Sequence, residues 1–259
     1  MTEHFPNAGG FELVVNNRVA LVVLNSPPRN ILTSQLQVRL ADALATLRAG
    51  RDHNVVFLIS ALADFSVGAD VAEHVGRENV QRMLKAAHGL IAEVLRHPVP
   101  VVACLRGHAL GGAFELALAC DHIIAAADTK LGTPEIVLGC YPPAATVLAP
   151  QKLPAGLASE MVLSGRVFSA PEMAQRAGIE VVADLEEAVK AAGARYADLP
   201  RGPLEEATRL MRCGAAERFE SAIGAIEAAY IDKLLQMHDA TEGPQAFLAK
   251  RKPVWDHTL

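Results

Sequence analysis

The chain has 259 residues, 51% hydrophobic and 20% charged, which is enough apolar sequence for one sizeable buried core. Its net charge of -5, with no cluster of Lys and Arg, argues against a nucleic-acid-binding surface, and its apolar runs are too short to span a bilayer. The N-terminus lacks the basic start and apolar stretch of a secretory signal, so we expect a cytoplasmic protein that does not enter a membrane.

Strand-like and helix-like segments alternate through the first half of the chain. Apolar runs bounded by turn residues indicate the strands, and apolar residues repeating along one face indicate the helices. The predicted elements are two strands within 11–24 around an Asn-Asn-Arg turn, a helix over 33–49 started by Thr33 or Ser34, a buried strand over 54–60, a helix near 78–96, a strand over 97–105, a helix over 111–120, and short strands over 121–127 and 130–132.

The remainder of the chain, from about residue 153, is predominantly helical in pattern. Breaks occur at 164–172 and 198–203, and only residues 179–183 have a strand-like pattern. The chain is therefore predicted to be α/β over its first three fifths and mainly α afterwards. Residues 219–237 have more apolar positions than one helix of a monomer usually needs, which favours contact with a partner subunit, although packing on the chain's own core is the alternative.

One glutamate stands in the otherwise apolar segment 105–121. Glu115 follows Gly111 and Gly112 by one turn of the predicted helix. The first N–H groups of a helix lack intrahelical partners and favour negative charge, and glycine lets a ligand approach the backbone. Glu115 could instead cap its own helix or pair with Arg106, and this segment alone leaves both interpretations open.

A second glutamate also precedes an apolar segment. Glu135 follows Thr133-Pro134 and comes before Ile-Val-Leu. Burial raises the pKa of a carboxylic acid, and two neighbouring carboxylates push each other's pKa values apart, so a buried pair can supply one acid and one base. A third segment, Ser-Val-Gly-Ala-Asp at 66–70, follows a predicted strand and could expose a backbone N–H at the edge of a cleft.

These segments resemble the three motif blocks of the crotonase, or enoyl-CoA hydratase/isomerase, superfamily. They are "SVGAD" at 66–70, "RGHALGGAFELALACD" at 106–121 and "LGTPEIVLG" at 131–139, and "EGPQAFLAKRKPVW" at 242–255 resembles the family's last helix. The resemblance implies an α/β spiral of ββα units. Residues 1–195 would form the spiral core with the CoA and acyl site, and 196–259 a helical C-terminal oligomerisation region of a homotrimer or of a hexamer made from two trimers.

The resemblance also implies roles for individual residues. The N–H groups of Ala69 and Gly112 match the oxyanion hole that holds the thioester carbonyl oxygen of an enolate. Glu115 and Glu135 match the two catalytic glutamates of hydratases, one activating water for attack at the β-carbon and the other protonating the α-carbon. Further residues implied to bind substrate are Arg29, Gly68, Asp70, Gly111, Tyr141, Pro143, Phe247 and Lys250. Coenzyme A is part of the substrate, so no separate cofactor is expected.

Two segments depart from the usual hydratase pattern. A Pro-Gly-Ala-Gly-Gly turn commonly follows the second glutamate, whereas this chain has "YPPAAT" at 141–146, and Pro143 removes an N–H and adds a ring. Ala72 stands where a lysine is common, while Arg29 and Lys250 match positions near the CoA nucleotide or are solvated surface cations. The segments "SPPRNIL" at 26–32 and "GCYPPAA" at 139–145 together most resemble the hydratases of cyclohexa-1,5-diene-1-carbonyl-CoA in anaerobic aromatic degradation.

Other functions are less compatible with the sequence. It contains no Gly-x-Ser-x-Gly elbow, Walker P-loop or dinucleotide Gly-x-Gly-x-x-Gly motif. Its four cysteines form no CxxC pair and its histidines no metal-like pair, so we expect reduced thiols and no metal. An enoyl-CoA isomerase that uses one glutamate is the main alternative. The paired acids argue against a non-catalytic scaffold, and the acidic charge balance argues against an RNA-binding member.

Overall fold

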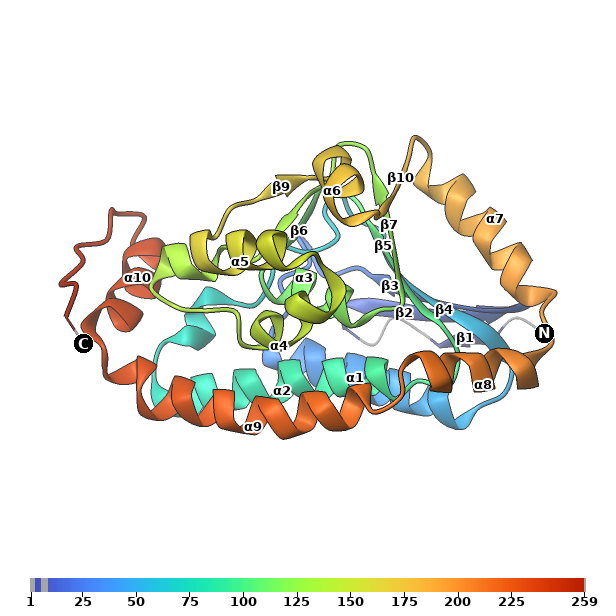
Figure 1. Ribbon diagram of the computed structural model, residues 1–259, viewed down its shortest axis with the longest axis horizontal. Coiled ribbons are helices and arrows are strands. Elements are labelled where there is room, and N and C mark those ends of the chain that lie inside the picture. Colours follow the sequence, from blue (N-terminus) through green and yellow to red (C-terminus); the bar gives the residue numbers. More distant parts are fainter. Residues whose placement is uncertain (1–2, 6–8, 259) are drawn as a thin grey trace.

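The computed structural model describes residues 3–5 and 9–258, and the strands form two sheets (Figure 1). In the larger sheet β1, β2 and β3 pair antiparallel, and every later pair is parallel. Its seven strands, in spatial order, are β1 (Glu3–Phe5), β2 (Phe11–Asn16), β3 (Arg18–Leu24), β4 (His53–Ser60), β5 (Val101–Leu105), β7 (His122–Ala126) and β10 (Glu180–Val182). The smaller sheet has the order β6 (His108–Leu110), β8 (Lys130–Gly132) and β9 (Phe168–Ser169).

From β5 to β8 the strands alternate between the two sheets, and a helix follows each pair. The chain passes from β5 in the large sheet to β6 in the small one before α3, and likewise from β7 to β8 before η2 and α4. This is the expected spiral of ββα units. The sequence pattern did not indicate β6 or β9, which have three and two residues, although it did indicate the equally short β8.

Ten α-helices and three short 3₁₀ helices occur in the described residues. In chain order they are α1 (Ser34–Ala49), η1 (Val71–His74), α2 (Arg77–Leu95), α3 (Gly112–Ala119), η2 (Pro134–Leu138), α4 (Pro143–Lys152), α5 (Ala155–Ser164), α6 (Ala170–Ala177), α7 (Leu185–Ala197), α8 (Arg201–Met211), α9 (Ala215–Asp232), η3 (Leu234–Gln236) and α10 (His238–Leu248). The predicted start of the first helix is confirmed, because the Thr33 side chain accepts a hydrogen bond from the N–H of Leu36 at 3.2 Å.

Helices cover both faces of the large sheet. In β4, Val56 and Leu58 pack into the main core, whereas Val55 and Phe57 belong to a second cluster with residues of α7. Successive strand residues point to opposite faces, so a strand covered on both sides has a continuous apolar sequence. In Figure 1, α7 lies apart from α1 and α2, which run together along the other side of the molecule.

The apolar face of residues 219–237 is used inside the subunit. Helix α9 runs beside α2 in Figure 1 and contacts both α2 and α4. Phe219, Ile223, Tyr230 and Ile231 are buried there. These four positions therefore stabilise the packing of α9 on its own core, which is the alternative that the sequence pattern left open. The boundary predicted after residue 195 falls in the last turn of α7.

The described residues also bear on the predictions for the cysteines, for a membrane-spanning helix and for a metal site. All four thiols are free, with Cys213 exposed and the other three buried. Across the part of the chain that the structure describes, there is no helix long and apolar enough to cross a bilayer. The described residues also contain no cluster of three or more His, Cys, Asp or Glu side chains arranged for a metal ion.

Candidate active site

Two adjoining cavities lie where the three motif segments meet. The outer one, of about 550 Å³, extends from Arg29 and Phe247 to Glu135. The inner one is much smaller, about 30 Å³, and is enclosed by Glu115, Glu135 and the side chains around them. Both cavities are lined by Ala69, His74, Gly112 and Glu135, so these residues mark the point where the outer cavity continues into the inner one.

The two expected oxyanion donors are close together at that point. Gly111 donates its N–H to the carbonyl of Gly132 at 2.9 Å, and Gly112 is the first residue of α3, where N–H groups have no intrahelical acceptor. A Cβ built on Gly112 would lie 3.9 Å from the amide nitrogen of Ala69. The predicted pair is thus brought together from segments more than 40 residues apart in the sequence.

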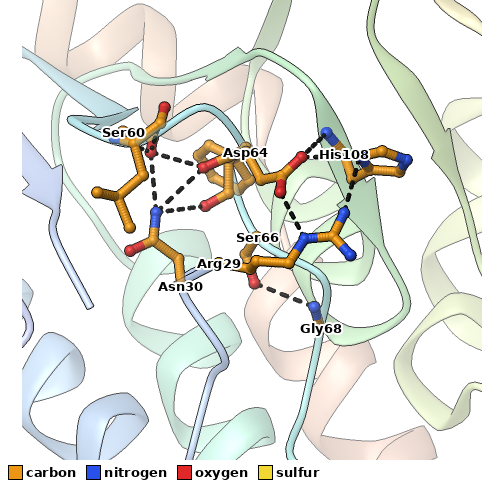
Figure 2. A network of polar contacts seen from close by, with 9 residues as sticks. Arg29, Asn30, Ser60, Asp64, Ser66, Gly68 and His108 are labelled. Atoms are coloured by element: carbon orange, nitrogen blue, oxygen red, sulfur yellow. Dashed lines mark hydrogen bonds and ion pairs between the residues drawn. The ribbon is translucent and has the colours of Figure 1, made fainter. Parts of the chain in front are cut away.

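A buried asparagine fixes the loop that carries Ala69 (Figure 2). The Asn30 side-chain amide donates to Ser60 Oγ at 2.8 Å and to the carbonyls of Asp64 and Phe65 at 3.1 and 3.0 Å. Further along the loop, the N–H of Gly68 donates to Ser66 Oγ at 3.0 Å. Sequence analysis missed Asn30. Its only signal is a polar residue between the predicted strand and helix, and many loops have one.

Glu115 is held by the first turn of another helix. Its Oε1 accepts the N–H of Ala145 at 2.8 Å. Pro142 and Pro143 have no N–H, so Ala144 and Ala145 supply the first free donors of α4, and the positive end of the helix faces the carboxylate. Both alternatives for Glu115 are excluded: it does not cap α3, and Arg106 pairs with Glu186 instead.

Glu135 reaches the same cavity from η2. Its Oε2 is buried and has no hydrogen-bond partner among the described residues. Gly111 permits its approach, because a Cβ on Gly111 would lie 2.8 Å from Glu135 Oε1. An unpaired buried oxygen is costly, which makes it a natural contact for a ligand in this cavity.

Their surroundings give the two carboxyl groups different acidities. Burial raises the pKa of Glu115, and the hydrogen bond from the N–H of Ala145 opposes that rise. Burial and the nearby charge of Glu115 raise the pKa of Glu135 well above its usual value. The pKa of Glu135 is therefore raised further than that of Glu115, which is the direction needed for one acid and one base in such a pair.

The mouth of the outer cavity has a charged cluster (Figure 2). Arg29 Nε donates to Asp64 Oδ2 at 2.6 Å, and His108 donates its backbone N–H to Asp64 Oδ1 at 2.9 Å. The guanidinium of Arg29 and the His108 side chain lower the pKa of Asp64 to about 2, burial acting in the opposite direction. The Arg29 side chain remains 47% exposed, so it can still receive an anionic group of a ligand.

The other predicted ligand-binding residues are distributed along the cavities. Gly68, Asp70 and the half-exposed Phe247 line the outer cavity, and Asp70 also caps η1 through Ala72. Tyr141 and Pro143 line the inner cavity. Lys250 follows the end of α10, is exposed and lines neither cavity.

The inner cavity also includes residues that sequence analysis did not select. They come from α1, α2, η1, α9 and the segment before α1, and are Leu32, Gln37, His74, Met83, Leu84, Ala87, His88 and Tyr230. The only indication for His88 in the sequence is its place on the apolar face of a predicted helix, where Leu84 and Leu95 also lie. That pattern fits a core histidine equally well.

Comparisons with known proteins identify the family and the fold of this chain. Residues 14–258 match the sequence model of the Enoyl-CoA hydratase/isomerase family. The chain is similar to a cyclohexa-1,5-dienecarbonyl-CoA hydratase of Thauera aromatica, 36% identical over 90% of this chain and 91% of the relative, and to a probable enoyl-CoA hydratase of Bacillus subtilis, 31% identical over 93% and 96%. The fold resembles an enoyl-CoA hydratase structure from Bacillus halodurans, with TM-score 0.86 and 20% identity over 92% of this chain and 100% of that one.

Proposed function

The chain belongs to the enoyl-CoA hydratase/isomerase family, and we propose that it is a hydro-lyase that adds water to an α,β-unsaturated acyl-CoA thioester. The single observation that carries this proposal is the pair of buried glutamates, one hydrogen-bonded and one with a free oxygen, near the backbone amides of Ala69 and Gly112. The hydratase names of two relatives at 36% and 31% identity support it.

The amides of Ala69 and Gly112 would hold the thioester carbonyl oxygen. As water adds to the β-carbon, the electron pair of the double bond moves toward the carbonyl and leaves negative charge on that oxygen. Preorganised N–H donors stabilise such a charge, and removing one donor typically costs ~2.7–4 kcal/mol of barrier. The N-terminus of α3 adds its positive dipole end at the same place.

The two glutamates would divide the proton transfers. Glu115, held as a carboxylate by Ala145, accepts a proton from the attacking water while the oxygen of that water bonds to the β-carbon. Glu135, which keeps its proton because of burial and the nearby Glu115, donates it to the α-carbon of the enolate. The summed change is the addition of one water across the double bond, after which a proton must pass from Glu115 to Glu135 to restore the starting state.

Isomerisation is the second candidate, because the family includes isomerases. An isomerase needs one proton shuttle and introduces no oxygen. The experiment that separates the two uses crotonyl-CoA in water enriched in oxygen-18, with mass spectrometry of the product. Incorporation of the label supports hydration. A shifted double bond without label would replace it with isomerisation.

The acyl group that we propose is a cyclic dienoyl thioester. The relative from Thauera aromatica is named for such a substrate, and Pro143 is a buried part of the inner cavity wall. A rigid wall should favour a flat ring over a long flexible chain, by a preference of about 1–3 kcal/mol for a small shape mismatch. Cyclohexa-1,5-diene-1-carbonyl-CoA should therefore have a higher kcat/KM than crotonyl-CoA, and the reverse order would point to a short-chain enoyl-CoA hydratase. Pro143→Gly should bring the kcat/KM values for the two substrates closer together.

We also propose a cytoplasmic homotrimer, or a hexamer of two trimers, that needs no cofactor besides the CoA moiety of its substrate. An apolar surface patch beside η2 supports assembly. This η2–α5 patch consists of Ile136, Val137, Leu163 and Val167, with Leu163 74% and Val137 59% exposed. Contiguous apolar patches of this kind are typical of subunit interfaces.

A further inference from the structure

A histidine outside the family motifs borders the inner cavity and is hydrogen-bonded to a glutamate behind it. His88 lies on α2 with its side chain only 6% exposed, and its Nδ1 is hydrogen-bonded to Glu227 on α9. The ring also makes an edge contact with Phe219, with centroids 6.1 Å apart. His88 is thus held from the side of α9, and it lines the inner cavity together with Glu115, Glu135 and Gly112.

The bond to Glu227 determines which ring nitrogen is available to the cavity. A carboxylate accepts hydrogen bonds, so Nδ1 must carry the hydrogen that it donates. In the neutral ring, Nε2 then carries a lone pair. The structure gives Nε2 no hydrogen-bond partner within residues 9–258, and His88 lines the inner cavity together with Glu115.

Glu115 alone offers an attacking water only one hydrogen-bond acceptor. Its Oε1 is occupied by Ala145, whereas Oε2 lies near the oxyanion residue, 3.8 Å from a Cβ built on Gly112. A water that donates one hydrogen to Oε2 can still rotate about that bond. A second acceptor for its other hydrogen would fix the direction of its lone pair.

We propose that Nε2 of His88 is this second acceptor in the inner cavity. The proposal rests on the hydratase function proposed above. The water donates one hydrogen to Glu115 and the other to His88, and its lone pair attacks the β-carbon. Glu115 takes the proton as the carbon–oxygen bond forms, and His88 takes none. Glu227 is a positioning residue that keeps the imidazole in the tautomer with a free Nε2.

The competing explanation is a purely structural pair that ties α2 to α9. Two substitutions of the same residue separate the explanations. In His88→Asn the side-chain amide lies near the place of Nδ1, so the contact with Glu227 can be kept while the cavity loses Nε2. In His88→Gln the amide reaches toward the place of Nε2, so the cavity keeps a polar group while the contact with Glu227 is lost.

The readouts are kcat and KM for enoyl-CoA hydration, with thermal unfolding of each variant. We expect His88→Asn to lower kcat by about a hundredfold with little change in KM, and His88→Gln to stay within about tenfold of wild type, as for loss of a positioned group near a transferring proton. Wild-type kcat in His88→Asn, or equal losses in both variants, would overturn the proposal.

Substitution of Glu227 provides a second test if His88→Asn does not fold. Glu227→Gln keeps an acceptor for Nδ1, and its kcat should remain near wild type. Glu227→Ala leaves His88 without its anchor and should lower kcat at nearly unchanged KM, whereas unchanged kcat would contradict the positioning role. If the wild-type protein incorporates no oxygen-18 with any enoyl-CoA tested, it is the hydratase function that fails, and not the role of His88 alone.

Discussion

The carboxylate of Glu135 lies where a side chain on Gly111 would have to be. A Cβ added to Gly111 would approach Glu135 Oε1 to 2.8 Å, and Gly111 has a positive φ of 56°. The start of α3 and the buried acid can therefore pack together only because residue 111 has no side chain. The position of Glu135 therefore depends on the same glycine segment that carries the oxyanion donor Gly112.

Replacing Gly111 with alanine should consequently displace Glu135. Gly178→Ala is the matched control, since Gly178 has a similar φ of +70° but no atom within 4 Å of the added Cβ. Both variants carry the left-handed strain of about 1–2 kcal/mol, so both should lose some thermal stability. Only Gly111→Ala should lower kcat, by about a hundredfold or more. Equal kcat in the two variants would show that the close packing is unimportant for turnover.

Amide replacement of either glutamate should abolish most of the activity. Glu115→Gln still has an oxygen for the N–H of Ala145, and Glu135→Gln is nearly isosteric, so folding and thioester binding should persist. Removal of a positioned acid or base typically costs 10²–10⁴-fold in rate, about the loss expected here. Steady-state kinetics and titration with a product thioester measure the two quantities. The exposed Glu187→Gln is the control, and wild-type turnover in either active-site variant would refute the assignment.

The pH dependence should be bell-shaped. Activity rises as Glu115 ionises and falls as Glu135 loses its proton, with the alkaline limb displaced upward because the pKa of Glu135 is raised well above its usual value. The folded state favours protonated Glu135, so its contribution to stability is present at low pH and is lost as the pH rises through the folded pKa. Glu135→Gln should therefore flatten the alkaline decline in thermal stability. If the alkaline loss of thermal stability were unchanged in Glu135→Gln, a group other than Glu135 would be responsible for that loss.

Arg29 is expected to affect binding of the CoA part and not the chemical step. Its guanidinium is half-exposed at the mouth of the outer cavity, whereas Glu115 lines only the inner one. Arg29→Ala should raise KM for an enoyl-CoA about tenfold, as for one lost charged hydrogen bond of ~1.5–3 kcal/mol, with kcat nearly constant. The corresponding N-acetylcysteamine thioester, which lacks the nucleotide, should show no such change. A comparable effect on both substrates would place Arg29 elsewhere in the mechanism.

The η2–α5 patch gives a test of assembly. Light scattering of the wild-type protein at micromolar concentration should give the mass of a trimer or hexamer. Val137→Asp introduces a charge into the patch and should shift the mass toward the monomer, because burying an unpaired carboxylate at an interface is costly. Lys190→Asp, on the exposed face of α7, should leave the mass unchanged. A monomeric wild-type protein would contradict the proposed assembly.

The order and type of the longer elements were predictable from the sequence. Apolar periodicity reports whether a segment is covered on one face or on both, and this is why the fully buried β4 and the helix begun at Thr33 were recognised. Glu115 and Glu135 were recognised for a related reason. An acid inside an apolar segment is unfavourable unless it has a specific use or partner.

Partners of polar groups were decided only by the tertiary structure. Arg106 was a reasonable partner for Glu115 by sequence distance, yet Glu115 meets Ala145, 30 residues along the chain, because α4 packs on α3 with its N-terminus toward that carboxylate. Nothing in the local sequence specifies which backbone N–H another element will present. The same holds for Asn30, whose importance depends on three acceptors from residues 60–65.

The place of His88 shows the same division between sequence and structure. Its position on the apolar face of α2 follows from helical periodicity, and that pattern is shared by any buried histidine. The proposed contact of His88 with a ligand depends on α9, which binds one ring nitrogen through Glu227 and leaves the other without a protein partner among the described residues. The sequence thus determines which residues are buried. Which polar atoms remain unpaired in the cavity is set by the packing of helices distant in the chain, since a hydrogen bond depends on distance and direction that no periodicity encodes.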